Sequence, residues 1–159
     1  MQPDYAKQLL NAIIEDLEDL THSNGDDLLF TGVQKIWLDY PDSVPAATVL
    51  STATSVTDDS INFSNRNYGF VISTYQYIEN NSDQDAAEQR IDDLLDIQDR
   101  LLDYLQQIPN PIERVVSDVH VHNIAVTNIL FNYQQSEGGL RLFLDVEFNL
   151  AVNINNKTI

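Results

Sequence analysis

Residues 140–154 alternate strictly between apolar side chains and mostly polar ones. The apolar set is Leu140, Leu142, Leu144, Val146, Phe148, Leu150, Val152 and Ile154. Between them stand Arg141, Phe143, Asp145, Glu147, Asn149, Ala151 and Asn153. This period of two predicts a strand with one buried face and one mostly hydrated face. A predicted strand at residues 117–133 precedes it across the glycine-containing turn 136–139, so we expect a long closing β-hairpin.

Two other segments have the apolar spacing of amphipathic helices. The first covers residues 4–20, and the second covers residues 86–108, where Pro109 stops it. Asp85 and Glu88 resemble a capping pair at the start of the second helix. The predicted inner face of this helix comprises Ala87, Ile91, Leu94, Leu95, Gln98, Leu101, Leu102, Leu105 and Ile108.

The segments between the two helices have β-type composition. Residues 30–38 and 68–78 are predicted strands. Residues 46–57 are rich in Thr, Val and Ser, which predicts an edge strand or an arm. Residues 58–67 are polar and predict a loop.

The order of helix, two or three strands, long helix and hairpin predicts an α+β fold. We expect one domain over residues 1–159, because a chain of this length seldom holds two. In it, a mostly antiparallel sheet carries both main helices on one face. Residues 46–67 form a possible extended arm or loop, and residues 155–159 form a tail.

Acidic residues dominate the charge of the chain. It has 25 Asp and Glu against 8 Lys and Arg, for a formal net charge of −17. Such a surface repels phosphate, which disfavours ordinary nucleic-acid binding and anionic membranes. Basic proteins and cations remain possible partners, although excess acid also simply keeps a small domain dispersed.

The absence of cysteine excludes disulfides and thiolate zinc sites. No apolar run is long enough to span a bilayer, and we expect no signal peptide.

Asp118, His120 and His122 alternate on a predicted strand, so their side chains share one face. Carboxylate and imidazole groups are metal ligands, but Asp118 and His122 lie about 13 Å apart along an extended strand. Only His120 and His122 are close enough to share an ion, and we favour two surface histidines instead.

The sequence has no Gly-x-Ser-x-Gly elbow and no glycine-rich phosphate loop with lysine. We therefore expect neither enzymatic activity nor a cofactor or metal.

Four aspartates, Asp92, Asp96, Asp99 and Asp103, follow one side of the second predicted helix. Neighbouring members repel by a few tenths of a kcal/mol per pair, and Arg100 relieves part of this from Asp96. A solvated outer face is the favoured interpretation. The alternative is a small acidic adaptor domain whose helix docks a basic partner.

One ordered set of segments covers nearly the whole chain. It consists of the opening helix from residue 5 to 20, residues 30–38, the proline-punctuated residues 40–49, the strand 68–78, the helix that begins at residues 85–88 and the closing hairpin. This layout resembles that of the tail terminator proteins of long-tailed bacteriophages, also called tail completion or minor tail proteins. Neck, connector and sheath-joining subunits of phages share the layout, so they stay as alternatives.

The resemblance implies an α+β virion structural protein that assembles in the host cytoplasm and resides in the tail or neck. Members of this family form hexameric rings that cap the tail tube and join it to head-completion or neck proteins. DNA passes through the lumen, and a negative channel would keep it from sticking in transit.

By the same analogy, part of the sheet would face the lumen or a neighbouring subunit. The candidate lumen-facing residues are Asp145, Glu147 and Asn149. The candidate inter-subunit arm contains Asp58, Asp59, Phe63 and Arg66, and would reach a neighbour by strand addition at a sheet edge.

Overall fold

The computed structural model describes residues 4–60, 63–114 and 119–155. Its elements, in chain order, are α1 (Tyr5–Asp19), β1 (Gly32–Gln34), β2 (Ala46–Asp59), β3 (Phe63–Glu79), α2 (Gln84–Gln106), the 3₁₀ helix η1 (Pro111–Arg114), β4 (Val119–Ser136) and β5 (Gly139–Asn155). The strands form one sheet in the order β1-β2-β3-β5-β4. Only β1 and β2 are parallel, and every other neighbouring pair is antiparallel. The predicted α+β class is therefore confirmed.

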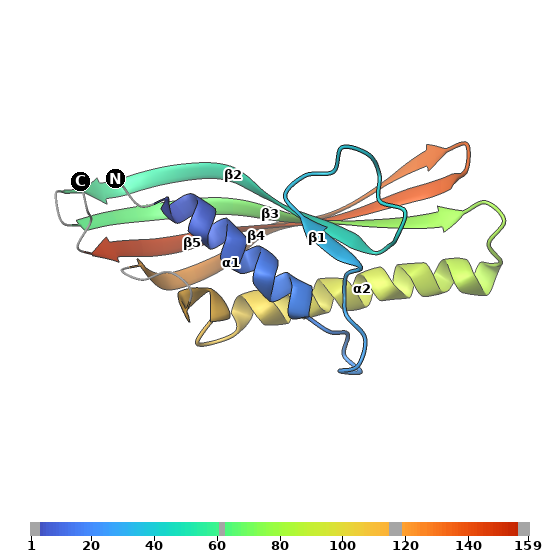
Figure 1. Cartoon of the computed structure of the whole chain (residues 1–159), viewed down its shortest axis with the longest axis horizontal. Coiled ribbons are helices and arrows are strands. Elements are labelled where there is room, and N and C mark those ends of the chain that lie inside the picture. The colour runs from blue at the N-terminus through green and yellow to red at the C-terminus, as the bar shows by residue number, and fades with distance from the viewer. Residues whose placement is uncertain (1–3, 61–62, 115–118, 156–159) are drawn as a thin grey trace.

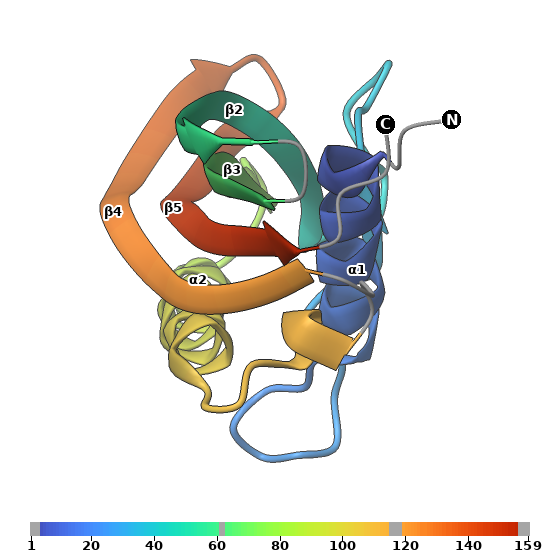
Figure 2. The ribbon, with the colours of Figure 1, turned by 90° about the vertical axis from the view of Figure 1, so that its left-hand side faces the viewer.

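The centre of the sheet is the long pair β3 and β5, which runs without a register shift from Phe63 to Glu79. The apolar set of β5 faces the core: Val146, Phe148 and Leu150 are buried beside their β3 partners. The alternation in residues 140–154 thus predicted the buried face correctly. Figure 2, which looks along the strands, shows that the sheet is strongly curved, with β4 arching around one side.

Both helices cover the same face of the sheet, as the sequence predicts. Figure 1 shows α1 crossing the sheet while α2 runs along it, and their buried residues belong to one core cluster with the inward residues of β3 and β5. Asp4 caps α1 by accepting a hydrogen bond from the Lys7 amide at 3.3 Å. The hydroxyl of Tyr104 in α2 donates to Asp16 Oδ2 in α1 at 2.7 Å, which joins the two helices. No helix of the described residues is long and apolar enough to cross a membrane.

Helix α2 differs from its predicted start and inner face. Its N-cap is Asp83, which accepts from the Ala86 amide at 2.7 Å, so the predicted capping pair was wrong. The helix meets the sheet only from Leu94 onward, through Leu94, Ile97, Leu101, Tyr104 and Leu105. The predicted inner residues Ile91, Leu95 and Ile108 are exposed. The helical spacing is right, but the contact face is rotated and shortened, because the turns of α2 before Leu94 contribute no buried residue.

The predicted strand at residues 30–38 is mostly wrong, because only Gly32–Gln34 pairs with β2. After Gln34 the chain leaves the sheet edge and forms the long β1–β2 connection, which lies on the side of the sheet away from α2 in Figure 1. The aromatic residues of this connection, Trp37 and Tyr40, pack against Tyr75 of β3. These tertiary contacts replace the strand pairing that the local pattern predicted.

The predicted loop at residues 58–67 was also wrong. Strand β2 continues to Asp59, and β3 begins at Phe63. Cross-strand pairs Asp58–Asn65 and Asp59–Ser64 extend the ladder almost to the tip of this β2–β3 hairpin. Asp58 and Asp59 are exposed at this hairpin end, where no apolar side chain is required, whereas Ser64 is fully buried.

Strand β4 continues past its predicted end at residue 133 and ends at Ser136, while the predicted start at residues 117 and 118 lies outside the described residues. The predicted hairpin turn is confirmed, with Ser136 paired to Gly139 across it. In the predicted tail, Asn155 is still part of β5, and residues 156–159 lie outside the described part of the chain.

Candidate functional site

The candidate lumen residues Asp145, Glu147 and Asn149 lie on the second face of the sheet, which is the face not covered by helices. Asp145 pairs with Ser73 and Glu147 pairs with Val71 of β3. Asp145 and Glu147 are half-buried, while Asn149 is exposed. One carboxylate oxygen of Asp145 is buried without a hydrogen-bond partner. The three side chains share a face, and their lining of a lumen stays a prediction.

One end of this second face is covered by the β1–β2 connection. The ring of Tyr40 stacks on Tyr75 at 5.2 Å between centroids and contacts Phe143 at 6.3 Å. The guanidinium of Arg141 lies 4.1 Å from the Tyr40 ring centroid, a cation–π contact. Burial raises the pKa of the Tyr75 phenol above its ordinary value, although a hydrogen bond with Arg141 opposes this. Trp37 and Tyr40 of the β1–β2 connection therefore both contact this face, through Tyr75.

The outer edge of β2 is unpaired beyond Thr48 in the part of the chain that the structure describes. All residues from position 50 to 59 are exposed, including the apolar side chains of Leu50 and Val56. An edge strand of this length presents free amide and carbonyl groups to solvent. The predicted edge or arm is therefore a strand edge, and its contact with another subunit stays a prediction.

The β2 edge bends where Thr52 and Ala53 together oppose Gly69 of β3. A Cβ on Gly69 would collide with Thr52 Oγ1 and would lie 3.0 Å from the Ala53 carbonyl oxygen. The same Cβ would lie 3.1 Å from Asn149 Oδ1. Glycine is therefore required there for β2 to approach the second face closely.

The opposite edge of the sheet is β4, which has no outer neighbour along its length among the described strands. Three large apolar side chains near its C-terminal end are exposed: Leu130, Phe131 and, with 76% of its surface accessible, Tyr133. Exposed apolar side chains on an unpaired strand favour contact with another protein surface. The sequence did not single out these residues as a surface, because alternation alone cannot distinguish an outer strand from an inner one.

The predicted arm residues divide into two groups. Asp58 lies on β2 opposite Asn65, near the hairpin tip, and Phe63 is half-buried at the start of β3. Arg66 instead turns toward the helices: its guanidinium donates to Tyr68 Oη at 3.0 Å and lies 5.8 Å from the Tyr5 ring centroid. Arg66 is thus engaged within the subunit and is a poor candidate for an inter-subunit contact.

The acidic row of α2 is only partly an outer face. Asp92, Asp99 and Asp103 are exposed, but Asp96 is half-buried against the segment after α1. His22 Nδ1 lies 2.6 Å from Asp96 Oδ2, and the Ser23 hydroxyl donates to Asp96 Oδ1 at 2.8 Å.

The predicted relief of Asp96 by Arg100 is therefore wrong. Arg100 donates to the Thr21 carbonyl at 2.9 Å and pairs with Asp103 at 3.4 Å. A tertiary contact has replaced the i, i+4 pair, because the segment after α1 crosses α2 at this point.

Partial burial raises the pKa of the Asp96 carboxyl, but the hydrogen bonds from His22 and Ser23 outweigh it. The net pKa of Asp96 therefore lies below its ordinary value. The aspartate that sequence reasoning placed in a solvated row instead holds two distant segments of the fold together.

His120 and His122 are both exposed on β4, with ring centroids 6.4 Å apart. Asp118, the third member of the predicted set, lies outside the described residues. Among the residues that are described, no group of three or more His, Cys, Asp or Glu side chains could hold a metal ion.

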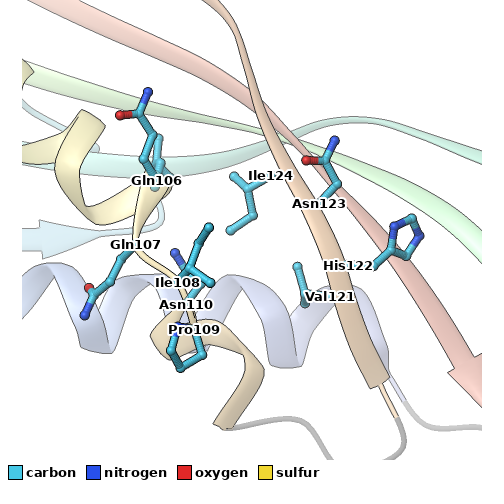
Figure 3. Close-up of a pocket in the computed structure, with 10 residues that line it drawn as sticks. Gln106, Gln107, Ile108, Pro109, Asn110, Val121, His122, Asn123 and Ile124 are labelled. Atoms are coloured by element: carbon cyan, nitrogen blue, oxygen red, sulfur yellow. The ribbon is translucent and has the colours of Figure 1, made fainter.

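A hollow of about 380 Å³ lies beside β4, under the turn between α2 and η1. Figure 3 shows that Val121 and Ile124 point toward this turn, whereas the His122 ring points away from Pro109. The imidazole of His122 is thus at the rim, and the hollow presents no set of groups positioned for acid–base or nucleophilic chemistry.

No protein-family model matches this sequence, and a search of curated proteins found no match.

Proposed function

We propose that this chain is a virion structural protein of the tail-terminator type. In this role it forms a ring at the end of a phage tail tube, joins the tube to head-completion or neck proteins, and lets DNA pass through the lumen. The proposal includes no enzymatic activity and no cofactor. It rests first on the resemblance of the ordered segments described above.

The observation that carries the proposal furthest is the pair of unpaired edges on one sheet. A subunit with two different free edges can bind the next copy head to tail, and such heterologous contacts produce a ring when the rotation closes. The helices cover one face of the sheet and the β1–β2 connection covers one end of the second face, so the rest of the second face, with the half-buried Asp145 and Glu147, is available to line the inside. A lining of carboxylates would repel the phosphates of passing DNA.

The first test is the mass of the purified protein, measured by native mass spectrometry and light scattering over a wide range of concentration. We expect a hexamer, alone or after addition of tail tubes, and a ring with a central hole in negative-stain images. A chain that remains a monomer or dimer even on tube ends would contradict the proposal.

The second test addresses the lining. In the Asp145→Lys/Glu147→Lys variant we expect rings to form and to bind duplex DNA at low salt, in a salt-dependent manner. The matched control is Asp92→Lys/Asp99→Lys, which changes the net charge equally but on the outside of α2. Equal DNA binding by both variants, or by neither, would remove the lining assignment and leave the ring intact.

The acidic adaptor remains a second candidate, and one observation favours it. Asp92, Asp93 and Asp96 of α2 line one shallow hollow together with Asp27. Because Asp96 already binds His22 and Ser23, less negative charge is available there for a basic partner. A monomer that binds polylysine, and loses this binding in Asp92→Asn/Asp93→Asn, would favour the adaptor.

A further inference from the structure

We infer that the β2 edge of one copy pairs antiparallel with the β4 edge of the next copy, with Asp58 placed against His120. The inference rests on the proposed ring and specifies the contact that closes it. Strand direction is compatible, because β2 and β4 run in opposite directions within the subunit through the antiparallel pairs with β3 and β5. A neighbour added at either edge would therefore continue the antiparallel sheet.

Asp58 and His120 lie on the same face of the sheet. They also lie at the same level, by which we mean that they belong to one row of directly paired residues across the strands. Asp58 pairs with Asn65, Asn65 pairs with Asn153, and Asn153 pairs with His120. Directly opposite residues of a sheet point to the same side. Copies related by rotation without a shift along the strands therefore bring Asp58 of one copy next to His120 of the other.

The two edges also match in length. From Asp58 to Leu50, β2 advances eight residues while its β3 partners advance six, because β2 contains two bulges. From His120 to Asn128, β4 likewise advances eight residues against six on β5, again with two bulges. Bulges discourage pairing with an ordinary flat strand. Because β2 and β4 each contain two extra residues between the same two levels of the sheet, their edges can still pair residue by residue.

Charge is complementary at one end of this contact. Asp58 and Asp59 are the only acidic residues of β2, which has no basic ones. His120 and His122 are the only imidazoles of β4, and that strand contains no Asp, Glu, Lys or Arg. In a chain with 25 acidic residues and 3 histidines, the long edge strand that has no carboxylate is the one that would meet Asp58. An imidazole opposite a carboxylate forms a hydrogen bond or an ion pair across the strands.

Strand β1 limits how much of the β2 edge can pair with a neighbouring copy. It occupies the β2 edge at Ala46–Thr48, so only the edge from Val49 to Asp59 can accept a neighbour. Leu50 on this free part lies level with Asn128 of β4, through Val71 and Glu147. Leu50 and Asn128 therefore provide a second predicted contact, eight residues from the first on each strand.

Engineered disulfides test this register, because the chain has no cysteine of its own. We expect Asp58→Cys/His120→Cys and Leu50→Cys/Asn128→Cys to give a covalent ladder of oligomers on mild oxidation, which reduction returns to monomer. Within one subunit the two cysteines are three strand spacings apart, about 14 Å, which is too far for a disulfide. The ladder therefore reports contacts between copies.

The matched control is Asp58→Cys/Asn132→Cys. Asn132 is on the same strand and face as His120 but at the opposite end of the sheet, level with Ala46. We expect no ladder from this variant. The thermal unfolding of each reduced variant, compared with that of the unmodified protein, verifies the fold, and the second cysteine pair serves if one variant fails to fold.

The outcomes separate this inference from the proposed function. Rings that form while neither test pair cross-links more than the control would overturn the edge contact and leave the ring. Covalent dimers or open chains without rings would support the edge contact and contradict the tail-terminator ring. A protein that neither assembles nor cross-links, with or without tube ends, would overturn both.

Discussion

Asp96 of α2 lies 2.6 Å from His22, through Oδ2 and Nδ1, although 74 positions separate the two residues in the sequence. The same carboxylate accepts from the Ser23 hydroxyl at 2.8 Å. Replacing Asp96 with Ala removes both hydrogen bonds and leaves the half-buried His22 ring nitrogen without this partner, whereas the exposed Ser23 hydroxyl can bond to water. We expect a loss of about 1–2 kcal/mol in the free energy of unfolding. Urea denaturation measures this loss.

The matched control is Asp99→Ala, an exposed aspartate one turn further along α2, for which we expect a change within about 0.5 kcal/mol. Equal losses in the two variants would show that the effect comes from helix charge rather than from the His22 contact.

The contribution of Asp96 also depends on pH. Its carboxyl has a pKa below the ordinary value in the folded protein, so between the folded and unfolded pKa the unfolded chain binds more protons. The stabilisation is fully present above the unfolded pKa of about 3.9 and is lost as pH falls through the folded pKa. We expect the stability difference between the unmodified protein and Asp96→Asn to be constant near neutral pH and to shrink below about pH 4. Unfolding curves from pH 7 to pH 3 measure it, and a difference that grows on acidification would contradict the assignment.

At Gly69 the bulged residues of β2 leave no room for a side chain. An alanine there would press against Thr52 and the Ala53 carbonyl, and we expect Gly69→Ala to lower the free energy of unfolding by about 1–3 kcal/mol. Gly32→Ala is the control, because nothing lies within 4 Å of a Cβ at that position. If Gly69→Ala and Gly32→Ala change the free energy of unfolding equally, the β2 bulge does not restrict position 69 to glycine.

Asn110 connects the end of α2 to η1 from a buried position. Its side-chain amide donates to the Tyr104 carbonyl at 2.7 Å, and its oxygen accepts from the Ile112 amide at 3.0 Å. Asn110→Ala removes both hydrogen bonds: the Ile112 amide loses this acceptor, while the Tyr104 carbonyl keeps the longer hydrogen bond from the Gln107 amide at 3.4 Å. We therefore expect a loss of about 1–3 kcal/mol in the free energy of unfolding. The exposed neighbour Gln106→Ala should change stability by less than about 0.5 kcal/mol, as thermal or urea unfolding of both variants will show.

Local sequence patterns predicted the elements in which buried residues recur at a fixed spacing along the chain. The inward face of β5 was predicted in full from its alternation, because a one-residue shift would expose every apolar side chain at once. The inner face of α2 was predicted less well. Helical spacing identifies an apolar stripe, but which part of the stripe is covered depends on where the sheet lies, and Ile91 and Leu95 fall outside that contact.

The candidate site depended still more on long-range contacts. Asp145, Glu147 and Asn149 were predicted to share a face, and they do, because alternation in one strand determines it. No sequence pattern indicated that Arg66 turns toward Tyr5, that Tyr40 covers Tyr75, or that His22 meets Asp96. Each contact joins segments far apart in the chain.

By itself, the sequence determined the two helices, the apolar face of the closing hairpin and the excess of acidic residues, because period, composition and charge are local properties. The tertiary structure alone decided which strands lie at the sheet edges, that Asp58 and His120 share a level, and which aspartates of α2 are free. These properties depend on strand order and register, which arise from packing between distant segments and leave no mark at a fixed sequence spacing.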